Sequence, residues 1–434
     1  MKSPLRLGLA GLGTVGASLA RLIETKSETL ANRVGRPIEL AGISARDRLK
    51  DRGFDTSQLA WFDDPVALAE NGDIDVFVEL IGGDTGPALE AVTAALGRGL
   101  PVVTANKALL AHHGVALATL AARNETEILF EAAVAGGIPI IKTMREALSG
   151  NDVSRVYGIL NGTCNYMLTR MENEGIAFDD CLKDAQRLGY AEADPTFDIG
   201  GFDAAHKLAI LTSLAFGCEI DLDSVFIEGI SSVTNDDIEA AAELGYRIKL
   251  LAVAQLTETG IEQRVHPTMI PAHSALAQVD GVTNAVAVDS DLLGSILLAG
   301  PGAGGDATAS AVLSDIMDVA GGVLPPTLGL PPTKLVPYKR ARMRAHEGGY
   351  YIRLSVYDRV GAFASIARRM AENEISLESI VQRRREDSGD ATTAPVILVT
   401  HETTEAAVRK ALELVSKDGH LKDEPKMIRI EALD

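Results

Sequence analysis

The sequence predicts an α/β protein with a parallel sheet at the N-terminus, an α+β domain in the middle and a small βαββαβ domain at the C-terminus. Short apolar strands alternate with helical segments over residues 1–130, which is typical of a parallel sheet with right-handed crossovers. Strands and helices mix over residues 131–304. A proline-rich segment, residues 323–348, then precedes residues 349–434, a length sufficient for one small domain.

The N-terminal part begins with the apolar run Leu5–Ala10, which suits a buried strand, and helical periodicity starts at Thr14. More strands and helices are expected in alternation after this pair: strands at Ile38–Ser44, Ile74–Leu80 and Pro101–Thr104, and helices at Asp64–Glu70, Pro87–Arg98 and Leu109–Arg123.

The middle part opens with strand-like segments at Ile128–Ala133, Ile138–Ile141 and Arg155–Leu160. A glycine-rich turn from Gly300 enters an alanine-rich helix, residues 305–322, which we expect to return to the first domain. Clustered prolines after it favour a stiff extended linker and a domain boundary: Pro325, Pro326, Pro331, Pro332 and Pro337.

The C-terminal part has the order of a ferredoxin-like βαββαβ domain. A polar loop, RREDSGDAT, separates its two middle strands. The expected elements are a strand at Tyr350–Tyr357, a helix at Ala362–Asn373, strands at Ile375–Arg383 and Pro395–Thr400, a helix at Thr404–Ser416 and a strand at Met427–Leu433.

The composition excludes several classes of protein. Lys and Arg number 41 and Asp and Glu 60 among the 434 residues, and the net charge of −19 opposes binding to nucleic acid. Apolar runs such as Leu208–Cys218 are shorter than the ~18–20 residues that cross a bilayer, so no membrane span is expected. The cysteines, Cys164, Cys181 and Cys218, lack metal or disulfide spacing, which fits a reducing cytoplasm.

The extreme N-terminus admits two interpretations. Lys2 and Arg6, followed by the small apolar stretch Leu7–Ala20, resemble the start of a secretory signal. Glycines interrupt this stretch, however, and Gly is a poor helix former. They form a GxGxxG pattern at a strand-to-helix turn, the fingerprint of a Rossmann-type dinucleotide site, in which backbone N–H groups face the pyrophosphate. The predicted contacts are Gly11, Leu12, Gly13, Thr14, Val15 and Gly16.

The choice between NADP and NAD depends on the end of the second strand, where an acidic residue accepts bonds from the ribose and a basic one faces the extra phosphate. Here Arg46 follows the strand, with Arg48 and Lys50 nearby, while Glu39 comes too early. This pattern favours NADP, although all three cations could equally be solvated loop residues.

A loop and helix over Leu188–Leu211 gather acidic residues and then a lysine. Asp203 and Lys207 are spaced i,i+4 and therefore share a helix face, which continues into apolar residues. A lysine at the edge of a buried face has a lowered pKa and can exchange a proton with a hydroxyl or carbonyl oxygen. The alternative is a helix-start salt bridge worth a few tenths of a kcal/mol.

The sequence around this pair resembles the homoserine dehydrogenase family at Ala185, Gly189, Tyr190, Asp194, Pro195, Asp198, Gly201, Asp203 and Lys207. The resemblance covers nearly the whole chain through the segments GLAGLGTVG, VVTANK, EAAVAGGIPII, NGTCNYM and GPGAG. It implies NAD(P)-dependent interconversion of L-homoserine and L-aspartate 4-semialdehyde in threonine, methionine and isoleucine biosynthesis.

The resemblance also implies roles for individual residues. Lys207 is expected to donate the proton, and Lys107 to orient substrate and cofactor. The substrate is expected to contact Asp203, Glu192, Asp198, Tyr190 and the backbone N–H groups near Gly162 and Thr163, although the hydroxyl of Thr163 could instead cap a helix. Further cofactor contacts are implied at Gly82, Thr104, Lys107, Gly189, Glu192 and Gly304.

A monovalent cation such as Na⁺ is implied beside the site in the same way. The expected ligands are the carboxylate of Glu131 and the carbonyls of Val134, Gly136 and Ile138. The alternative for Glu131 is an exposed residue at a strand end.

Cys164 supports a competing hypothesis, in which its thiol forms a thiohemiacetal with an aldehyde. Free cysteine is more often a small buried apolar residue, and no histidine follows in the motif to activate it.

The C-terminal domain resembles an ACT domain through Asp358-Arg359-Val360-Gly361 and the segment EISLESIVQ. That resemblance implies an amino-acid effector, with threonine the natural candidate, at the interface of a homodimer or homotetramer. The turn has Val360 where proline is common, so a purely structural or dimerising role is the alternative.

Together these patterns predict a cytoplasmic, NADP-preferring homoserine dehydrogenase with an effector domain and without an aspartate kinase half. Two other functions stay open: an NADP-dependent oxidoreductase of another amino-acid semialdehyde, and a non-catalytic sensor of NADP and amino acids.

Overall fold

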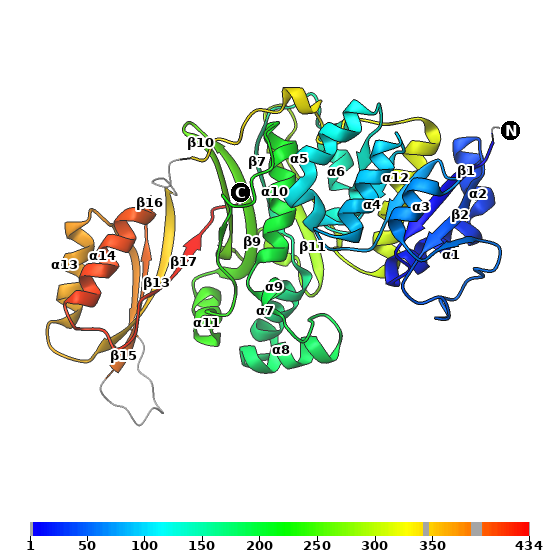
Figure 1. The fold of residues 1–434 in the computed structure, drawn as a ribbon. Coiled ribbons are helices and arrows are strands. Elements are labelled where there is room, and N and C mark those ends of the chain that lie inside the picture. The colour runs from blue at the N-terminus through cyan, green and yellow to red at the C-terminus, as the bar shows by residue number, and fades with distance from the viewer. Residues whose placement is uncertain (1–2, 342–346, 383–392, 434) are drawn as a thin grey trace.

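The computed structural model describes residues 3–341, 347–382 and 393–433. Figure 1 shows an elongated molecule in which the N-terminal part, the middle part and the C-terminal part follow one another along the long axis. The two ends of the described chain lie apart, because the C-terminus returns to the middle part. None of the helices in the described residues combines the length and apolar character that crossing a bilayer demands.

The N-terminal sheet has six parallel strands in the order β3-β2-β1-β4-β5-β6, which confirms the predicted Rossmann-type sheet. Its expected strands and helices are present, and the sequence patterns missed α2 and β3. The elements are β1 (Leu5–Ala10), α1 (Thr14–Thr25), α2 (Ser27–Val34), β2 (Ile38–Ser44), β3 (Ala60–Phe62), α3 (Pro65–Asn71), β4 (Val76–Glu79), α4 (Pro87–Gly97), β5 (Val102–Thr104), α5 (Lys107–Arg123) and β6 (Ile128–Leu129).

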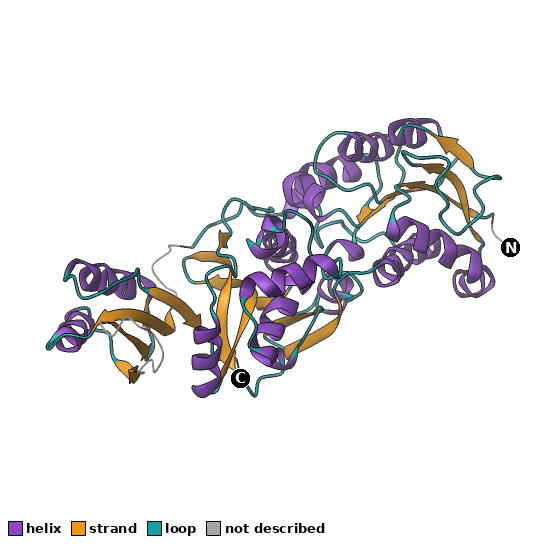
Figure 2. Ribbon diagram, turned by 90° about the horizontal axis from the view of Figure 1, so that it is seen from below, coloured by secondary structure: helices purple, strands orange, loops and turns teal. Residues whose placement is uncertain are grey.

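Helices cover both faces of this sheet, as Figure 2 shows. One apolar core lies between the sheet and α3, α4 and α5, and a second lies on the other face beneath α1. The helix α12 (Gly305–Gly321), far along the chain, packs against α1 in the second core. Residues after the middle domain therefore complete the nucleotide-binding part.

The segment after β5 differs from the prediction. The expected strand Ile128–Ala133 is shorter and belongs to the N-terminal sheet, and a 3₁₀ turn, η1 (Glu131–Ala133), ends it. The expected strand Ile138–Ile141 is wrong: its place holds α6 (Ile140–Lys142) and the π-helical η2 (Thr143–Ala147). The carboxylate of Glu131 accepts hydrogen bonds from the N–H groups of Ile141 and Lys142, both at 2.9 Å, and so stabilises a helical turn in a sequence of β-branched residues.

The middle part is a mixed sheet with helices on one face. Helix α10 packs against β7, β9 and β10 and carries the Asp203 and Lys207 pair. The elements are β7 (Val153–Ile159), α7 (Gly162–Glu174), α8 (Phe178–Arg187), α9 (Thr196–Ile199), α10 (Phe202–Phe216), β8 (Phe226–Ile227), α11 (Asn235–Glu243), β9 (Tyr246–Thr257), β10 (Gly260–Pro271), η3 (Leu276–Gln278), β11 (Thr283–Ser290) and β12 (Gly294–Pro301).

The C-terminal part has the strand order β17-β13-β15-β14 and confirms the predicted βαββαβ architecture. The predicted polar loop RREDSGDAT and Arg383 lie outside the described residues. The elements are β13 (Glu347–Tyr357), α13 (Ala362–Glu372), β14 (Leu377–Gln382), β15 (Thr393–Thr400), β16 (Thr403–Thr404), α14 (Glu405–Lys417) and β17 (Lys426–Ile430).

The middle and C-terminal sheets are joined, which the sequence patterns did not indicate. The last strand, β17, pairs in parallel with β10 through Thr268 with Arg429 and Met269 with Ile430. The result is one continuous path of strands from β12 to β14.

The described part of the proline-rich segment is extended, and it also packs against its neighbours, which the sequence patterns did not indicate. Val336 forms a parallel bridge with Cys218, and Arg340 forms one with Ile261. Leu328, Leu335 and Ala341 are buried. The two bridges hold the end of the segment against the middle domain. Earlier in the segment, Thr327 donates to Glu127 and accepts from the N–H of Ile128, and the short 3₁₀ turn η4 (Pro332–Lys334) contacts α5 of the N-terminal part.

Candidate active site

A cavity of about 570 Å³ lies between the nucleotide-binding part and the middle domain. The first turn of α1, the start of α5, the start of α7, the start of α10 and the turn before α12 all contribute to it. Its walls include many of the predicted residues: Val15, Lys107, Gly136, Gly162, Thr163, Gly189, Tyr190, Asp198, Asp203, Lys207 and Gly304.

The glycine turn has the geometry that the fingerprint requires. Gly11 has φ +100°, and a Cβ there would lie 2.3 Å from the carbonyl oxygen of Leu80. A Cβ on Gly16 would lie 2.0 Å from the carbonyl oxygen of Gly11, whereas Gly13 faces open space. The first and third glycines are therefore fixed by packing, and the second leaves room for a ligand beside the N-terminus of α1.

Asp203 lies between two lysines at the inner end of the cavity. Its Oδ2 accepts from Nζ of Lys207 at 2.7 Å, and its Oδ1 is 2.9 Å from Nζ of Lys107. Burial alone would raise the pKa of Asp203, but the two ammonium charges outweigh it and hold that pKa well below its usual range. The carboxylate is thus ionised at every physiological pH and fixes both cations.

Lys207 is 8 % exposed, and burial lowers the pKa of its ammonium group, while the Asp203 charge opposes that change. Two of the three N–H donors are occupied, one by Asp203 and one by the carbonyl oxygen of Leu160, at 2.7 Å each. Because the side chain also lines the cavity, the third donor is available to a ligand oxygen there.

Asn161, which the sequence analysis did not single out as a site residue, organises the acidic side of the cavity. Its Nδ2 donates to Oδ1 of Asp198 at 2.8 Å and to Oδ2 of Asp203 at 2.9 Å. Its Oδ1 accepts from the N–H of Cys164 at 2.8 Å and caps α7. Burial raises the pKa of Asp198, and the Asn161 bond acts against this rise. The sequence signal that could have identified Asn161 is its position directly before the helix α7, since Asn is a preferred N-cap residue.

The start of α7 also positions the loop on the opposite wall. The alternative interpretation, in which Thr163 caps a helix, is wrong, because Asn161 is the N-cap of α7. The Oγ1 of Thr163 instead donates to the carbonyl oxygen of Tyr190 at 2.7 Å. The residues around this bond, including Gly162, Gly189 and Tyr190, line the cavity.

Several predicted cofactor residues lie outside the cavity walls. Arg46 is exposed at the end of β2, and Glu192 is exposed in the loop after α8. The hydroxyl of Thr104 donates to Oε2 of buried Glu79 at 2.6 Å. Oε1 of the same glutamate accepts from the N–H groups of Ile81 and Gly82. Thr104 and Gly82 therefore belong to a network that shapes the turn after β4.

The structure argues against Cys164 as a nucleophile. The thiol is fully buried, lies outside the cavity walls, and its Sγ donates to the carbonyl oxygen of Asp198 at 3.2 Å. Burial raises its pKa well above the ordinary value, and the charges of Asp198 and Asp203 add to that rise. A thiolate is disfavoured there.

The predicted cation ligand Glu131 is a buried carboxylate. Glu131 is 2 % exposed, which removes the alternative of an exposed residue, and burial raises its pKa. Both of its oxygens accept backbone bonds from α6, and the carbonyl of Ile138 accepts from the N–H of Ile140 at 2.8 Å. Each of these three oxygens accepts one hydrogen bond and retains a second lone pair, so the carboxylate and carbonyl oxygens fit a hard cation. No group of three or more His, Cys, Asp or Glu side chains with metal-ligand geometry occurs in residues 3–341, 347–382 and 393–433.

Comparisons with known proteins agree on one family. Residues 139–317 match the family model described as homoserine dehydrogenase, residues 11–131 match the model of its NAD-binding domain, and residues 350–413 match the ACT domain. The chain is similar to the homoserine dehydrogenase of Pseudomonas aeruginosa, with 44 % identity over 99 % of this chain and 100 % of that one. It is 43 % identical to that of Neisseria gonorrhoeae over 99 % of each chain.

The solved structures that resemble this chain belong to the same family. The homoserine dehydrogenase of Thiobacillus denitrificans superposes with a TM-score of 0.93 and 42 % identity over 99 % of each chain. A hyperthermophilic archaeal homoserine dehydrogenase in complex with NADPH superposes with a TM-score of 0.63 and 29 % identity, over 73 % of this chain and 97 % of that one.

Proposed function

The chain belongs to the homoserine dehydrogenase family, and from this premise we propose how its own residues carry out hydride transfer between L-homoserine and L-aspartate 4-semialdehyde. The observation that carries the proposal is the buried Lys207, held by Asp203 and directed into a cavity beside the glycine turn. The nicotinamide cofactor, when bound, supplies or accepts the hydride.

In the reductive direction, Lys207 gives a proton to the aldehyde oxygen as that oxygen gains negative charge. The O–H bond forms, one N–H bond of the ammonium breaks, and the neutral amine regains its proton from solvent. Burial lowers the pKa of Lys207 and makes this transfer easier, while Asp203 keeps the ammonium in place. In the oxidative direction the neutral amine accepts the hydroxyl proton.

Lys107 adds a second positive charge near the same oxygen, since both lysines bind the one carboxylate. A cation fixed before the reaction stabilises a developing alkoxide without the cost of reorganising solvent. Asp198 and Tyr190, with the N–H groups at the start of α7, are the cavity groups that we assign to the ammonium and carboxylate of the substrate. Glu192 joins them only if its exposed loop moves.

We propose NADP as the preferred cofactor. A nicotinamide cofactor itself is supported by the matched NAD-binding domain. The finer choice rests on Arg46 at the end of β2, where its guanidinium is exposed and close to the position that a ribose phosphate takes in this fold. The NADPH bound to the archaeal relative is in line with this proposal.

We also propose that Glu131, with the carbonyls of Val134, Gly136 and Ile138, would hold a monovalent cation such as Na⁺, whose role would be structural.

Regulation by an amino acid, threonine above all, is proposed from the ACT domain. A homodimer or homotetramer in the cytoplasm is the state in which we expect the enzyme to work, and the three buried free cysteines are compatible with a reducing compartment.

The test is a spectrophotometric assay of NADPH consumption with L-aspartate 4-semialdehyde, and of NADP reduction with L-homoserine. Turnover of both is expected, with near analogues of homoserine much slower. Binding of NADPH without consumption would favour the sensor, and faster turnover of another amino-acid semialdehyde would favour the alternative oxidoreductase.

A further inference from the structure

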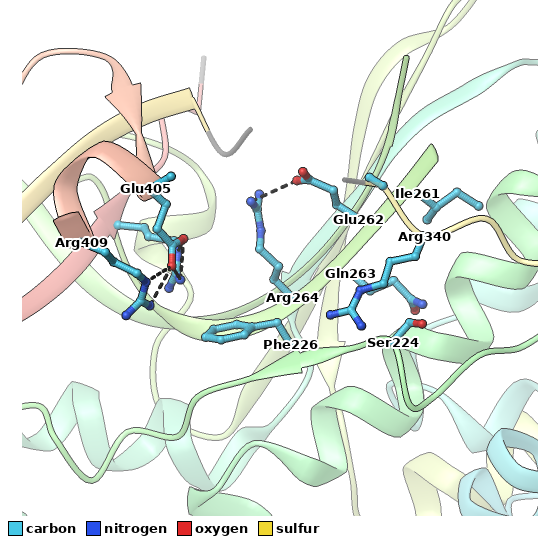
Figure 3. A pocket seen from close by; sticks show the side chains of 12 residues that line it. Ser224, Phe226, Ile261, Glu262, Gln263, Arg264, Arg340, Glu405 and Arg409 are labelled. Carbon is cyan, nitrogen blue, oxygen red and sulfur yellow. Dashed lines mark hydrogen bonds and ion pairs between the residues drawn. The ribbon is translucent and has the colours of Figure 1, made fainter. Parts of the chain in front are cut away.

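A second cavity, of about 220 Å³, lies where the C-terminal domain meets the middle domain, away from the candidate active site. Figure 3 shows it between the start of α14 and the strands β8 and β10. It is smaller than the ~300–1,000 Å³ pockets that hold drug-sized ligands, so its size suits a small metabolite.

On the wall formed by the C-terminal domain, the charged side chains are already paired with one another. Glu405 accepts from Nε of Arg429 at 2.9 Å and from Nε of Arg409 at 2.7 Å. Arg429 also lies 5.0 Å from the centre of the Phe226 ring, which belongs to the middle domain. This wall is therefore pre-formed and joins the two domains across the cavity.

The opposite wall carries charge with hydrogen-bonding capacity left over. Arg264, 92 % buried, pairs with Glu262 at 3.1 Å through Nη1 and with Glu431 at 3.6 Å through Nη2, while its buried Nε has no hydrogen-bond partner in the described part of the chain. In Figure 3 the guanidinium of Arg340 points from the same side toward Phe226. Nη2 of Arg264 lies 3.6 Å from Glu431, beyond hydrogen-bond distance, so this atom and the guanidinium of Arg340 are the donors that a carboxylate in the cavity would meet.

The surrounding charges select the kind of ligand. Arg264, Arg340, Arg409 and Arg429 line the cavity with Glu262 and Glu405, and Glu431 and Glu228 pair with two of these arginines from behind. Positive and negative groups thus nearly balance, which suits a zwitterion better than a phosphate dianion. The remaining lining is apolar, with Phe226, Ile261, Ala341 and Ala406 placed for a short aliphatic side chain.

We propose that this interdomain cavity binds a small α-amino acid, with its carboxylate on Arg264 and Arg340, its ammonium on Glu262, and its side chain against the apolar lining. The inference rests on the proposed regulation by an amino acid and gives that regulation a site other than the turn at residues 358–361.

The cavity is linked to the catalytic helix through two adjacent residue pairs. Phe226 pairs with Arg264 and Ile227 pairs with Val265 in neighbouring strands, and consecutive strand residues point to opposite faces. On the far face, the Cα of Gly201 packs so closely that an added Cβ would lie 3.1 Å from Val265 and 3.2 Å from Ile227. Gly201 is the N-cap of α10, which carries Asp203 and Lys207 two and six residues later. This close contact is the route by which a shift of the strands on ligand binding would reach the catalytic pair.

The experiment is calorimetric titration of the full-length protein with L-threonine, L-isoleucine, L-methionine and inorganic phosphate, each separately, alongside steady-state assays with and without each compound. We expect at least one amino acid to bind more tightly than phosphate and to change KM or kcat. Arg340→Gln removes an exposed guanidinium from the cavity, and we expect it to weaken that binding about tenfold or more while the basal kcat stays unchanged.

Two further variants make the result decisive. Ala406→Phe occupies the cavity from the exposed first turn of α14 and should abolish binding, whereas Arg359→Gln, in the turn after β13, should leave binding intact. The proposal is overturned if none of the three amino acids binds, if Arg340→Gln and Ala406→Phe bind like the parent protein, if Arg359→Gln alone loses binding, or if phosphate binds as tightly as the amino acids. Turnover of homoserine without any effector is measured in parallel, so that loss of this inference is distinguished from loss of the proposed function.

Discussion

Asp203 and Lys207 stand one turn apart on α10, and the carboxylate oxygen lies 2.7 Å from the ammonium nitrogen in a site where both side chains are buried. The same carboxylate holds Lys107 from α5 with its other oxygen. One acidic residue thus fixes two cations at the cavity wall. The burial of this pair distinguishes it from a solvated surface salt bridge, which would contribute little to stability.

The pH profile should move when Asp203 is replaced. Asp203 raises the pKa of Lys207 against the lowering by burial, so Asp203→Asn lowers that pKa further. Reduction of the aldehyde needs the protonated lysine and is lost as pH rises through its pKa; the basic limb of kcat/KM is therefore expected at lower pH in the variant. The measurement is kcat/KM for aspartate semialdehyde as a function of pH. An unchanged basic limb would mean that another group is the proton donor.

Asn161→Ala should reduce kcat/KM about ten- to a hundredfold, because Asp198 and Asp203 both lose a hydrogen bond and α7 loses its cap. The cap alone costs ~1 kcal/mol of stability. Asp64→Ala, which removes the cap of α3 at Val66, is the matched control for that loss and should retain activity. Equal activity of the two variants, with equal melting temperatures, would show that Asn161 only caps a helix.

Cofactor choice should depend on Arg46. We expect Arg46→Ala to raise KM for NADPH about tenfold and to leave KM for NADH nearly unchanged, since only NADPH carries the extra phosphate. Arg123→Ala, at the C-terminal end of α5, is the control for removal of a positive charge. The measurement is the ratio of kcat/KM for the two cofactors, and a ratio that stays constant removes Arg46 from phosphate binding.

Stability should fall with rising pH because of Asp315 on α12. Burial raises the pKa of this carboxyl to about 7, with the neighbouring Glu131 charge contributing. The folded protein therefore binds a proton that the unfolded chain releases near its ordinary pKa, and stability is lost as pH rises from that value toward 7. Asp315→Asn keeps an acceptor for the N–H of Glu131 and should gain on the order of a few kcal/mol at pH ~8, with a much smaller gain at pH ~4. Thermal melts of both proteins across this range test it, and parallel curves would contradict the assignment.

The local part of the site was predictable because its signals are short-range. Helical spacing placed Asp203 and Lys207 on one face, and the glycine fingerprint marked the turn after β1. The convergence of Lys107 on the same carboxylate depends on the packing of α5 against α10, which no spacing encodes. The family resemblance gave Lys107 a role in orienting substrate and cofactor, but it did not pair Lys107 with Asp203.

Other features required three-dimensional context. The β-branched Ile138, Ile140 and Ile141 suggested a strand, and the Glu131 carboxylate, brought from the preceding turn, stabilises a helical turn instead. The pairing of β10 with β17 joins strand edges far apart in the sequence, so the continuous sheet and the interdomain cavity could not be predicted from periodicity.

Turnover by a Lys207→Met variant tests the central claim most directly. Methionine fills much of the lysine volume without the ammonium, and Lys107 remains to neutralise Asp203, so the fold and NADPH binding should persist. We predict that kcat for reduction of aspartate semialdehyde falls ~10²–10⁴-fold while the Kd for NADPH, measured by fluorescence titration, is nearly unchanged. A variant that binds NADPH and turns over within about threefold of the parent kcat would contradict the assignment of Lys207 as the proton donor.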